Sequence, residues 1–524
     1  MKTIESIHLG ATHAGRRCGL LMSALGLAQV LLLQTRIGAA AVTLTALHSF
    51  EPTEGQGVSG LVQGRDGNFY GTAVGGGSGA VWNAGCGTIF RIAPNGTFTN
   101  LYSFSGTDGQ FPAGAGGPNT TGAGPGLVLG GDGNFYGITS AGGIGFRPSD
   151  PNGQPCYSQG PTGNGTIFRM TPDGTLTTLV FFDGTNGSSP SSILQGDDGN
   201  FYGTTSGILF GDLPAHWGTV FQMTPDGTLT TLAFFNGTNG SGPRSLIQER
   251  DGNFYGTTDG GGAYRHGTVF KMTLDGTLTT VVSLADTNAS GPYSLMQASD
   301  GNFYGTMFLG GKLSVYTVNG GTYRDYLGTI FRVSPTGTLT NLVQFNWNNG
   351  ALPVAALVEG TDGNLYGSTW SGGLGGTDGT TIGTLFKMTP QGKATTLLKF
   401  NGVNGLQPAA SLVQASDGSF YGTASLGGTN DTQSIGIGSG VVFRLSVPGA
   451  DTPKIINSSR SGNDFSVTWL SLVGRSYQLQ VSSDLAGTNW SNAGAVIIAT
   501  NRSSTTLDTL ASRPQGFYRV VLLP

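Results

Sequence analysis

The sequence predicts an all-β protein, a seven-bladed β-propeller followed by a small β-sandwich, and three observations support this. A hexapeptide, D-G-[NS]-[FL]-Y-G, recurs seven times, beginning at Asp66, Asp132, Asp198, Asp251, Asp300, Asp362 and Asp417. Four short β-rich runs bounded by turn residues accompany each copy, and the copies are 49 to 66 residues apart. Four antiparallel strands repeated at this period are typical of propeller blades, whose faces are buried against their neighbours.

The third unit shows the four runs most clearly. Ser192–Gln195 leads into the hexapeptide, and after a loop Gly218–Met223 and Thr228–Phe235 follow. Asp-Gly-Asn joins the first two runs and Pro-Asp-Gly the last two, and Gly or Asn accepts the positive φ that tight hairpin turns require. Each unit should therefore contain two tight hairpins.

The two ends of the repeat indicate how the ring closes. The last unit stops after Gly440–Leu445 and lacks its fourth run, whereas Thr43–Phe50 matches that run and precedes the first hexapeptide. We expect this N-terminal strand to complete the last blade, which would remove the exposed sheet edges of an open array. The propeller is thus assigned to residues 42–447.

The segments outside the repeat have other roles. Residues 1–41 contain Arg16-Arg17 and an apolar run of about 15 residues, shorter than the roughly 20 that span a bilayer, so we interpret them as a signal peptide. The mature protein should then be exported, either secreted or on the cell surface, with no transmembrane segment. Residues 448–453 are assigned as a linker, and 454–524 as a β-sandwich of immunoglobulin or fibronectin type III kind.

Composition and net charge limit the kinds of partner that the protein can bind. The chain has 92 glycines and only 10% charged residues, which fits a secreted all-β protein. A net charge of -4 without a cluster of Lys or Arg argues against nucleic acid as a partner. We expect a monomer with no cofactor.

Removal of the signal peptide leaves only two cysteines, Cys86 and Cys156. They precede the third strands of consecutive blades and could form one disulfide; two unpaired thiols are the alternative.

The connections between the second and third strands vary greatly in length and should lie at the end of the propeller opposite the hexapeptide hairpins. Loops that vary on a rigid scaffold commonly carry binding groups. Aromatic rings can stack on the C–H faces of sugars, so the candidate ligand-binding residues are Trp82, Tyr157, His216, Trp217, Tyr264, His266, Tyr326 and Trp370. The alternative is that these side chains simply pack the loops down.

Metal binding and catalysis have weaker support. His216 and His266 precede equivalent strands and could, with Asp212 or Asp259, bind a metal ion or perform acid–base chemistry. No tight ligand motif or catalytic triad accompanies them, so we predict neither a metal site nor catalytic residues. The repeated aspartate of the hexapeptide is expected to hold its turn.

The repeat text also resembles a known family. Segments such as Ser245–Gln248, Asp251–Thr258, Gly267–Met272 and Asp275–Thr280 are similar to the GloVer tandem repeats of exported bacterial proteins over about residues 42–447. The hexapeptide is also similar to the propeller repeats of two-component regulator sensors. The first resemblance implies display outside a bacterial cell, and neither implies catalytic residues.

Three functional hypotheses follow from the sequence. The first is an extracellular binding or scaffold protein that recognises a glycan or a cell-surface protein through its variable loops. The second is a polysaccharide-degrading enzyme, a lyase or glycosidase, which would need convergent acid and base groups. The third is a purely structural or protein-interaction module. Fold alone does not choose among them.

Overall fold

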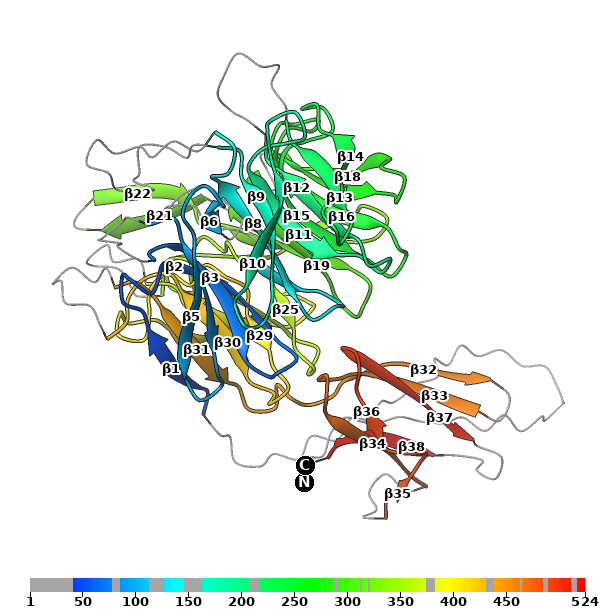
Figure 1. Ribbon diagram of the computed structural model, residues 1–524. Helices are drawn as coiled ribbons and strands as arrows, with labels where there is room; N and C mark the ends of the chain where they lie inside the picture. Colours follow the sequence, from blue (N-terminus) through cyan, green and yellow to red (C-terminus); the bar gives the residue numbers. More distant parts are fainter. Residues whose placement is uncertain are drawn as a thin grey trace.

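In the computed structural model, the strands of the repeat region form small antiparallel sheets (Figure 1). The structure describes residues 41–77, 85–112, 126–145, 163–207, 217–285, 290–311, 313–318, 321–373, 382–429, 438–461, 464–483, 489–509 and 516–523. Within these ranges every regular element is a β-strand, so the prediction of an all-β protein is confirmed.

Seven sheets in the described part of the chain each contain one hexapeptide, and we number them 1 to 7 in that order. Sheet 1 contains β2 (Gln56–Gln63), β3 (Phe69–Gly75), β4 (Thr88–Ile92) and β5 (Phe98–Ser103). Sheet 2 contains β6 (Gln110–Pro112), β7 (Leu127–Leu129), β8 (Phe135–Ala141), β9 (Thr166–Met170) and β10 (Leu176–Phe181). Sheet 3 contains β11 (Pro190–Gln195), β12 (Phe201–Thr205), β13 (Thr219–Met223) and β14 (Leu229–Phe234). Sheets 4 and 5 contain β15 (Ser241–Gln248), β16 (Phe254–Gly260), β17 (Thr268–Met272) and β18 (Leu278–Ser283); and β19 (Ser290–Gln297), β20 (Phe303–Leu309), β23 (Thr329–Val333) and β24 (Leu339–Gln344). Sheets 6 and 7 contain β25 (Val358–Glu359), β26 (Leu365–Thr369), β27 (Thr384–Met388) and β28 (Ala394–Lys399); and β29 (Val413–Gln414), β30 (Phe420–Ala424), β31 (Val441–Ser446) and β1 (Thr43–Ser49).

Sheet 7 joins the two ends of the repeat region. β1 pairs antiparallel with β31, from Thr43 opposite Ser446 to Ser49 opposite Val441. The N-terminal strand therefore occupies the place of the fourth run that the last unit lacks, as the sequence predicts.

Neighbouring sheets contact each other through the aromatic residues of the hexapeptide. The tyrosine of one sheet packs on the phenylalanine of the next with ring centroids 3.9 to 4.5 Å apart, in the pairs Tyr70–Phe135, Tyr136–Phe201, Tyr202–Phe254, Tyr255–Phe303 and Tyr366–Phe420. Tyr421 of sheet 7 packs on Phe69 of sheet 1 at 4.0 Å, so the series returns to its start. Between sheets 5 and 6, Tyr304 shares a core cluster with Leu365, which stands in the place of the phenylalanine. This arrangement resembles that of a β-propeller.

The glycine after each hexapeptide tyrosine lets a phenylalanine of the third strand pack closely. At Gly305, a Cβ atom would lie 2.2 Å from Cζ of Phe331, which is fully buried on β23. Only a residue without a side chain fits beneath that ring. This packing accounts for the Tyr-Gly pair in every copy of the hexapeptide.

Two connections differ from the simple four-strand unit. In sheet 2, two short strands, β6 and β7, both pair with β8 in place of one first strand. In sheet 5, the long connection after β20 forms a hairpin of its own, β21 (Leu313–Val318) paired with β22 (Gly321–Tyr326). The sequence analysis treated this connection only as a long loop.

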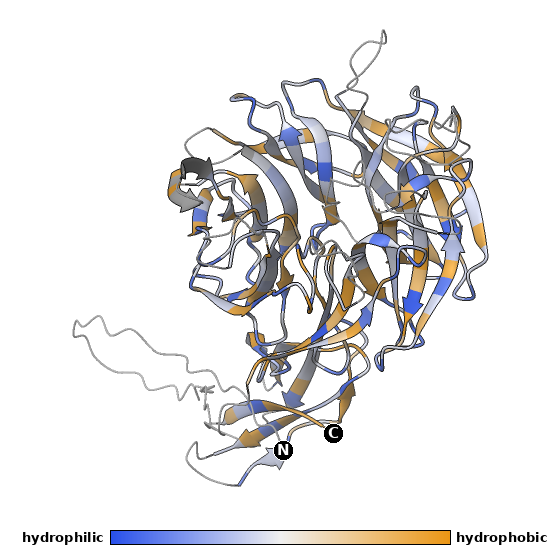
Figure 2. Cartoon of the chain, turned by 90° about the vertical axis from the view of Figure 1, so that its left-hand side faces the viewer, coloured by the Kyte–Doolittle hydropathy of each residue, from blue (hydrophilic) through white to orange (hydrophobic). Residues whose placement is uncertain are grey.

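The C-terminal module, which we define as residues 454–524, has two sheets and lies beside the repeat region (Figure 1). One described sheet contains β32 (Ile455–Ser461), β33 (Asp464–Leu470) and β37 (Ser503–Thr509), and the other β34 (Ser476–Ser482), β35 (Ser491–Asn492), β36 (Ile497–Ile498) and β38 (Phe517–Leu522). A single core cluster draws on both sheets and includes Val467 and Trp469 from β33 and Tyr477 and Leu479 from β34. Figure 2 shows apolar residues on the strands of this module, as on those of the repeat region. The sequence does not predict β32, β35 and β37 as strands, because they carry many polar residues.

Candidate functional site

The hexapeptide hairpins are held by their own aspartates. In all seven copies one carboxylate oxygen accepts a hydrogen bond from the backbone N–H two residues on. The other oxygen accepts the hydroxyl proton of the tyrosine four residues on, at 2.8 to 3.0 Å. Burial, together with the bonded carboxylate, raises the pKa of these tyrosines, to about 12 for Tyr202. The hydrogen bonds agree with the structural role expected for these aspartates.

A glutamine at the end of the first strand ties adjacent hairpins together. Its amide N–H donates to the carbonyl of the hexapeptide glycine, as from Gln248 to Gly252 at 3.1 Å. Its oxygen accepts a backbone N–H from the preceding sheet, as from Asp197 to Gln248 at 2.8 Å. Because these bonds join the hexapeptide turns of successive sheets, the turns lie at one common end of the repeat region, which we call the hairpin end.

Sheet 6 departs from this rule, because Glu359 occupies the glutamine position. Its carboxylate accepts the backbone N–H of Ser299 at 2.8 Å and the hydroxyl proton of the same serine at 2.6 Å. Burial raises the pKa of Glu359, and these two hydrogen bonds oppose the shift. A carboxyl group is thus placed where the other sheets, with the exception of sheet 2, carry a neutral amide.

Hydrogen bonds join the linker and the first residue of the C-terminal module to this hairpin end. The N–H of Lys454 donates to the carbonyl of Thr361 at 2.8 Å, and the hydroxyl of Thr361 donates to the carbonyl of Ala450 at 2.9 Å. Gln414 also donates to the carbonyl of Ala450, at 2.8 Å. The linker and the first residue of the module are therefore fixed against sheets 6 and 7.

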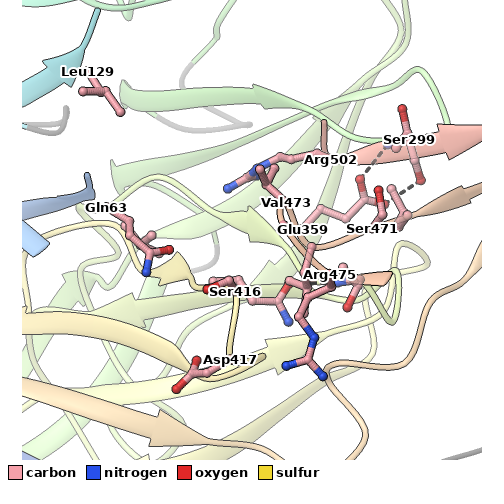
Figure 3. A pocket seen from close by; sticks show the side chains of 18 of the residues that line it. Gln63, Leu129, Ser299, Glu359, Ser416, Asp417, Ser471, Val473, Arg475 and Arg502 are labelled. Atoms are coloured by element: carbon pink, nitrogen blue, oxygen red, sulfur yellow. Dashed lines mark hydrogen bonds between the residues drawn. The ribbon is translucent and has the colours of Figure 1, made fainter. Parts of the chain in front are cut away.

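A cavity of about 840 Å³ lies between the hairpin end and the module (Figure 3). The ends of the first strands supply one wall, including Gln63, Arg65, Leu129, Arg250 and Glu359. The loop after β33 and the start of β37 supply the other wall, including Ser471, Val473, Arg475 and Arg502. The sequence analysis did not identify this site, because it placed function at the opposite end of the sheets.

Positive charge dominates the lining. Four arginines, Arg65, Arg250, Arg475 and Arg502, face two carboxylates, Glu359 and Asp417. Both carboxylates have hydrogen-bond partners of their own: Ser299 for Glu359, and Ser419 and Tyr421 for Asp417. Arg65 also donates to the carbonyl of Gly131, at 2.6 Å. What the cavity offers a ligand is therefore mainly the guanidinium groups of Arg250, Arg475 and Arg502.

Arg502 has an unusual environment. Its side chain is exposed, desolvation by the protein lowers the pKa of its guanidinium, and Glu359 acts in the opposite direction. Both observations hold if the side chain projects into the cavity. Figure 3 shows Arg502 reaching into the cavity above Glu359.

The predicted ligand-binding residues that the structure describes lie at the other end of the sheets, which we call the loop end. Trp217, Tyr264 and Tyr326 are 44%, 59% and 46% exposed, and each precedes the third strand of its sheet, in sheets 3, 4 and 5. His266 is partly buried, and its carbonyl accepts the N–H of Gly291 in sheet 5 at 3.3 Å. Trp82, Tyr157 and His216 lie outside the described residues, as does the proposed signal peptide except for its last residue.

Trp370 is a packing residue, which is the alternative to ligand binding that the sequence left open for these aromatic side chains. It packs against a small cluster at the loop end that contains Tyr293, Val354 and Ala409. Its role in the described structure is thus packing between sheets.

Next to this cluster is a charged group that the sequence analysis missed. The guanidinium of Arg244 lies 4.5 Å from the ring centroid of Tyr293 and forms an ion pair with Asp259 at 3.2 Å. Arg244 and Tyr293 both follow a Gly-Pro pair at the same place in the first strand, where other sheets have Ser, Val or Ala. Their departure from the repeat was a usable signal.

The remaining sequence predictions are tested only in part. Cys86 is buried and disulfide-bonded, but Cys156 lies outside the described residues, so the pairing of these two cysteines stays a prediction. No cluster of three or more His, Cys, Asp or Glu side chains suited to a metal ion is found within the described ranges. The described residues also contain no helix long and apolar enough to cross a membrane.

Comparison with known proteins identifies the repeat. The family model described as the Gloeobacter/Verrucomicrobia repeat matches residues 155–314 and again 309–496, more than half of the chain. The second match runs past the last sheet of the repeat region into the C-terminal module. No curated protein matches the sequence.

Several solved structures are distantly similar. A candidate 6-phosphogluconolactonase from Bacteroides uniformis is 13% identical with a TM-score of 0.42, over 83% of this chain and 98% of that one. An aldose sugar dehydrogenase from Streptomyces coelicolor is 12% identical with a TM-score of 0.35, over 78% and 100%. A gluconolactonase from Xanthomonas campestris is 14% identical with a TM-score of 0.32, over 54% and 79%. Similarity this distant has no bearing on function.

Proposed function

The chain belongs to the Gloeobacter/Verrucomicrobia repeat family, and from this premise we propose that it is an exported β-propeller that binds ligands outside the cell. The ligand class that we propose is glycan, and the surface is the loop end. The observation that carries this proposal is the exposure of large aromatic side chains on three consecutive sheets at that end.

The architecture within this proposal is a closed ring of seven blades with a C-terminal sandwich. The pairing of β1 with β31 and the packing of Tyr421 on Phe69 support closure of the ring. The core that both sheets of the C-terminal module share supports a sandwich. A rigid ring would hold the loops at fixed positions, as a binding surface requires.

Export has one structural support besides the sequence of residues 1–41. Cys86 is disulfide-bonded, and disulfides persist mainly in oxidising compartments outside the cytosol. A cell-surface or secreted location follows from this reasoning and from the GloVer resemblance.

The loop end suits sugars better than flat apolar partners. Trp217 and Tyr264 offer exposed rings for stacking, and the neighbouring ion pair of Arg244 and Asp259 offers planar polar groups for hydroxyls. A polysaccharide lyase or glycosidase would need acid and base groups poised near the sugar. Asp259 is the one described carboxylate that the sequence offered as an acid or base at the loop end. It already forms an ion pair with Arg244.

The direct test is retention of the purified protein on a panel of immobilised polysaccharides. We expect saturable retention that falls by about tenfold or more when Trp217 and Tyr264 are both replaced by alanine, since stacked aromatic anchors commonly dominate such contacts. The polysaccharide should be recovered at its original length. Shortened chains would instead favour the enzyme.

Leu274→Ala is the matched control. Leu274 is 55% exposed and lies just beyond the other end of β17 from Tyr264, at the opposite end of the same sheet. Its loss should leave retention unchanged. No retention on any polysaccharide would refute glycan binding and leave a protein partner or a structural role.

A further inference from the structure

We propose that the cavity between the hairpin end and the C-terminal module is a second binding site, specific for a small anionic molecule. The ligand class is a sugar-sized compound that carries a carboxylate or a phosphate. This site is separate from the loop end and does not depend on the glycan binding proposed there.

The size of the cavity fits such a ligand. Its volume of about 840 Å³ lies within the roughly 300 to 1,000 Å³ typical of small-molecule pockets. A mono- or disaccharide would fill only part of it, which leaves room for ordered water.

The charge of the lining contrasts with that of the chain. The protein carries a net charge of -4, yet the cavity is lined by four arginines and two carboxylates. Guanidinium groups bind carboxylates and phosphates through paired N–H donors, so arginine is the side chain best suited to such a ligand. The concentration of four arginines in one cavity of a weakly acidic protein points to an anion.

Arg502 lines the cavity close to Glu359, whose charge acts on its guanidinium. The side chain is exposed to water there, so a ligand can reach it. In a cavity an ionic hydrogen bond is less screened than at an open surface, so each contact contributes more to affinity.

Glu359 does not cancel this preference. Both of its oxygens already accept hydrogen bonds from Ser299, at 2.8 and 2.6 Å. It offsets part of the charge of Arg502, which keeps that side chain tolerable in the empty cavity. The four arginines of the lining still outnumber Glu359 and Asp417, so the cavity keeps an excess of positive charge.

The two walls come from different parts of the chain. Arg65 and Arg250 belong to sheets 1 and 4, whereas Arg475 and Arg502 belong to the module. A ligand held by both walls would strengthen the docking of the module. Binding should therefore also raise the melting temperature.

Isothermal titration calorimetry of the purified full chain provides the test, with D-glucuronate, glucose 6-phosphate and uncharged glucose as probes. We expect saturable binding of at least one anionic probe and none of glucose, and weaker binding at higher salt. A preference between the two anions identifies the charged group. If neither anion binds, or glucose binds equally well, the proposal is wrong.

Variants locate the site. Arg502→Met should weaken binding of the anionic probe by about tenfold or more, which corresponds to the loss of one charge-assisted hydrogen bond. Arg250→Met, on the opposite wall and outside the module, should also weaken binding and serves if Arg502→Met fails to fold. Arg460→Met on β32, outside the cavity lining, is the control and should bind as the native chain does. Unchanged affinity in both cavity variants would overturn the assignment.

The two proposed sites can fail separately. Replacing Trp217 and Tyr264 should abolish retention on polysaccharides without changing the titration with the anionic probe. If the variant with both Trp217 and Tyr264 replaced lost binding of the anionic probe as well as retention on polysaccharides, the two surfaces would not be independent. The second site would then be rejected.

Discussion

The hydrogen bond between Tyr366 and Asp362 should contribute more to stability than its counterpart between Tyr255 and Asp251. Both tyrosine hydroxyls donate to the carboxylate, at 2.8 and 2.9 Å. Both carboxylates also form an ion pair with a lysine, at 3.1 and 3.0 Å. The exposed fraction differs, because the Asp362 side chain is 9% exposed and the Asp251 side chain 43%. The repeat thus supplies the same tyrosine hydrogen bond and the same lysine ion pair in two environments. One further bond differs, because the amide of Asn364 donates to the Asp362 carboxylate whereas that of Asn253 donates to the backbone carbonyl of Asp251.

The expected cost of removing each hydroxyl follows from this difference. Tyr366→Phe leaves a buried carboxylate without one of its donors, which should lower the free energy of unfolding by about 2 to 3 kcal/mol. In Tyr255→Phe, water can replace the lost hydroxyl at the exposed carboxylate, so the loss should be about 0.5 to 1 kcal/mol. The two substitutions remove the same atom from equivalent positions of sheets 6 and 4.

Urea denaturation followed by tryptophan fluorescence measures both losses, with comparison restricted to variants whose unfolding slopes match that of the native chain. A double-mutant cycle of Tyr366→Phe with Asp362→Asn separates the pair's own energy from the effect of each substitution. If Tyr255→Phe proves as costly as Tyr366→Phe, burial is not what sets the value of these bonds, and the reasoning fails.

Three further predictions concern other parts of the chain. Burial raises the pKa of Glu249 to about 7, so the stability that its neutral form provides is present below about pH 4.5 and lost as the pH rises through 7. At pH 8 the free energy of unfolding of Glu249→Gln should exceed that of the native chain by about 1 kcal/mol after allowance for screening, and thermal denaturation should show a higher melting temperature. A difference independent of pH would contradict this. Gly305→Ala should cost about 1 to 3 kcal/mol in urea denaturation because its Cβ would lie 2.2 Å from a buried phenylalanine ring, whereas Gly301→Ala, at φ 81° with open space around it, should cost about 1 kcal/mol or less. A non-reduced peptide map should show Cys86 linked to Cys156 and lose that peptide in Cys156→Ala; free alkylation of Cys86 in the native chain would disprove the pair.

The sequence could predict the hairpins and the closing strand because their determinants are local or repeated. Asp362 and Tyr366 are four residues apart, and the same pair recurs in every unit, so one physical explanation accounts for seven turns. The sequence match between Thr43–Phe50 and the fourth run indicated the partner of β31 without any structure. For Trp217 and Tyr264 the sequence left exposure and packing of the loops as alternatives, because side-chain burial in a variable loop depends on tertiary contacts.

The cavity could not be predicted in this way, because it depends on how the module docks. The hydrogen bond from Thr361 to Ala450 joins residues 89 positions apart, and no local pattern encodes it. Arg502 lies outside the repeat, so no register comparison points to it. The sequence did contain one indication of this cavity, which is that Glu359 replaces the glutamine of the repeat. Arg244 and Tyr293 depart from the repeat in the same way at the loop end.

The pairing of β1 with β31 sets an order on biosynthesis. β1 is the first of the described strands to be made, but its partner ends at Ser446, so the seventh sheet cannot form until nearly all of the repeat region is available. At a synthesis rate of about 5 to 20 residues per second, β1 waits for roughly 20 to 80 seconds with its edge unpaired. A chain truncated before Val441 would keep that edge permanently, so incomplete products should aggregate or be degraded rather than accumulate as smaller rings.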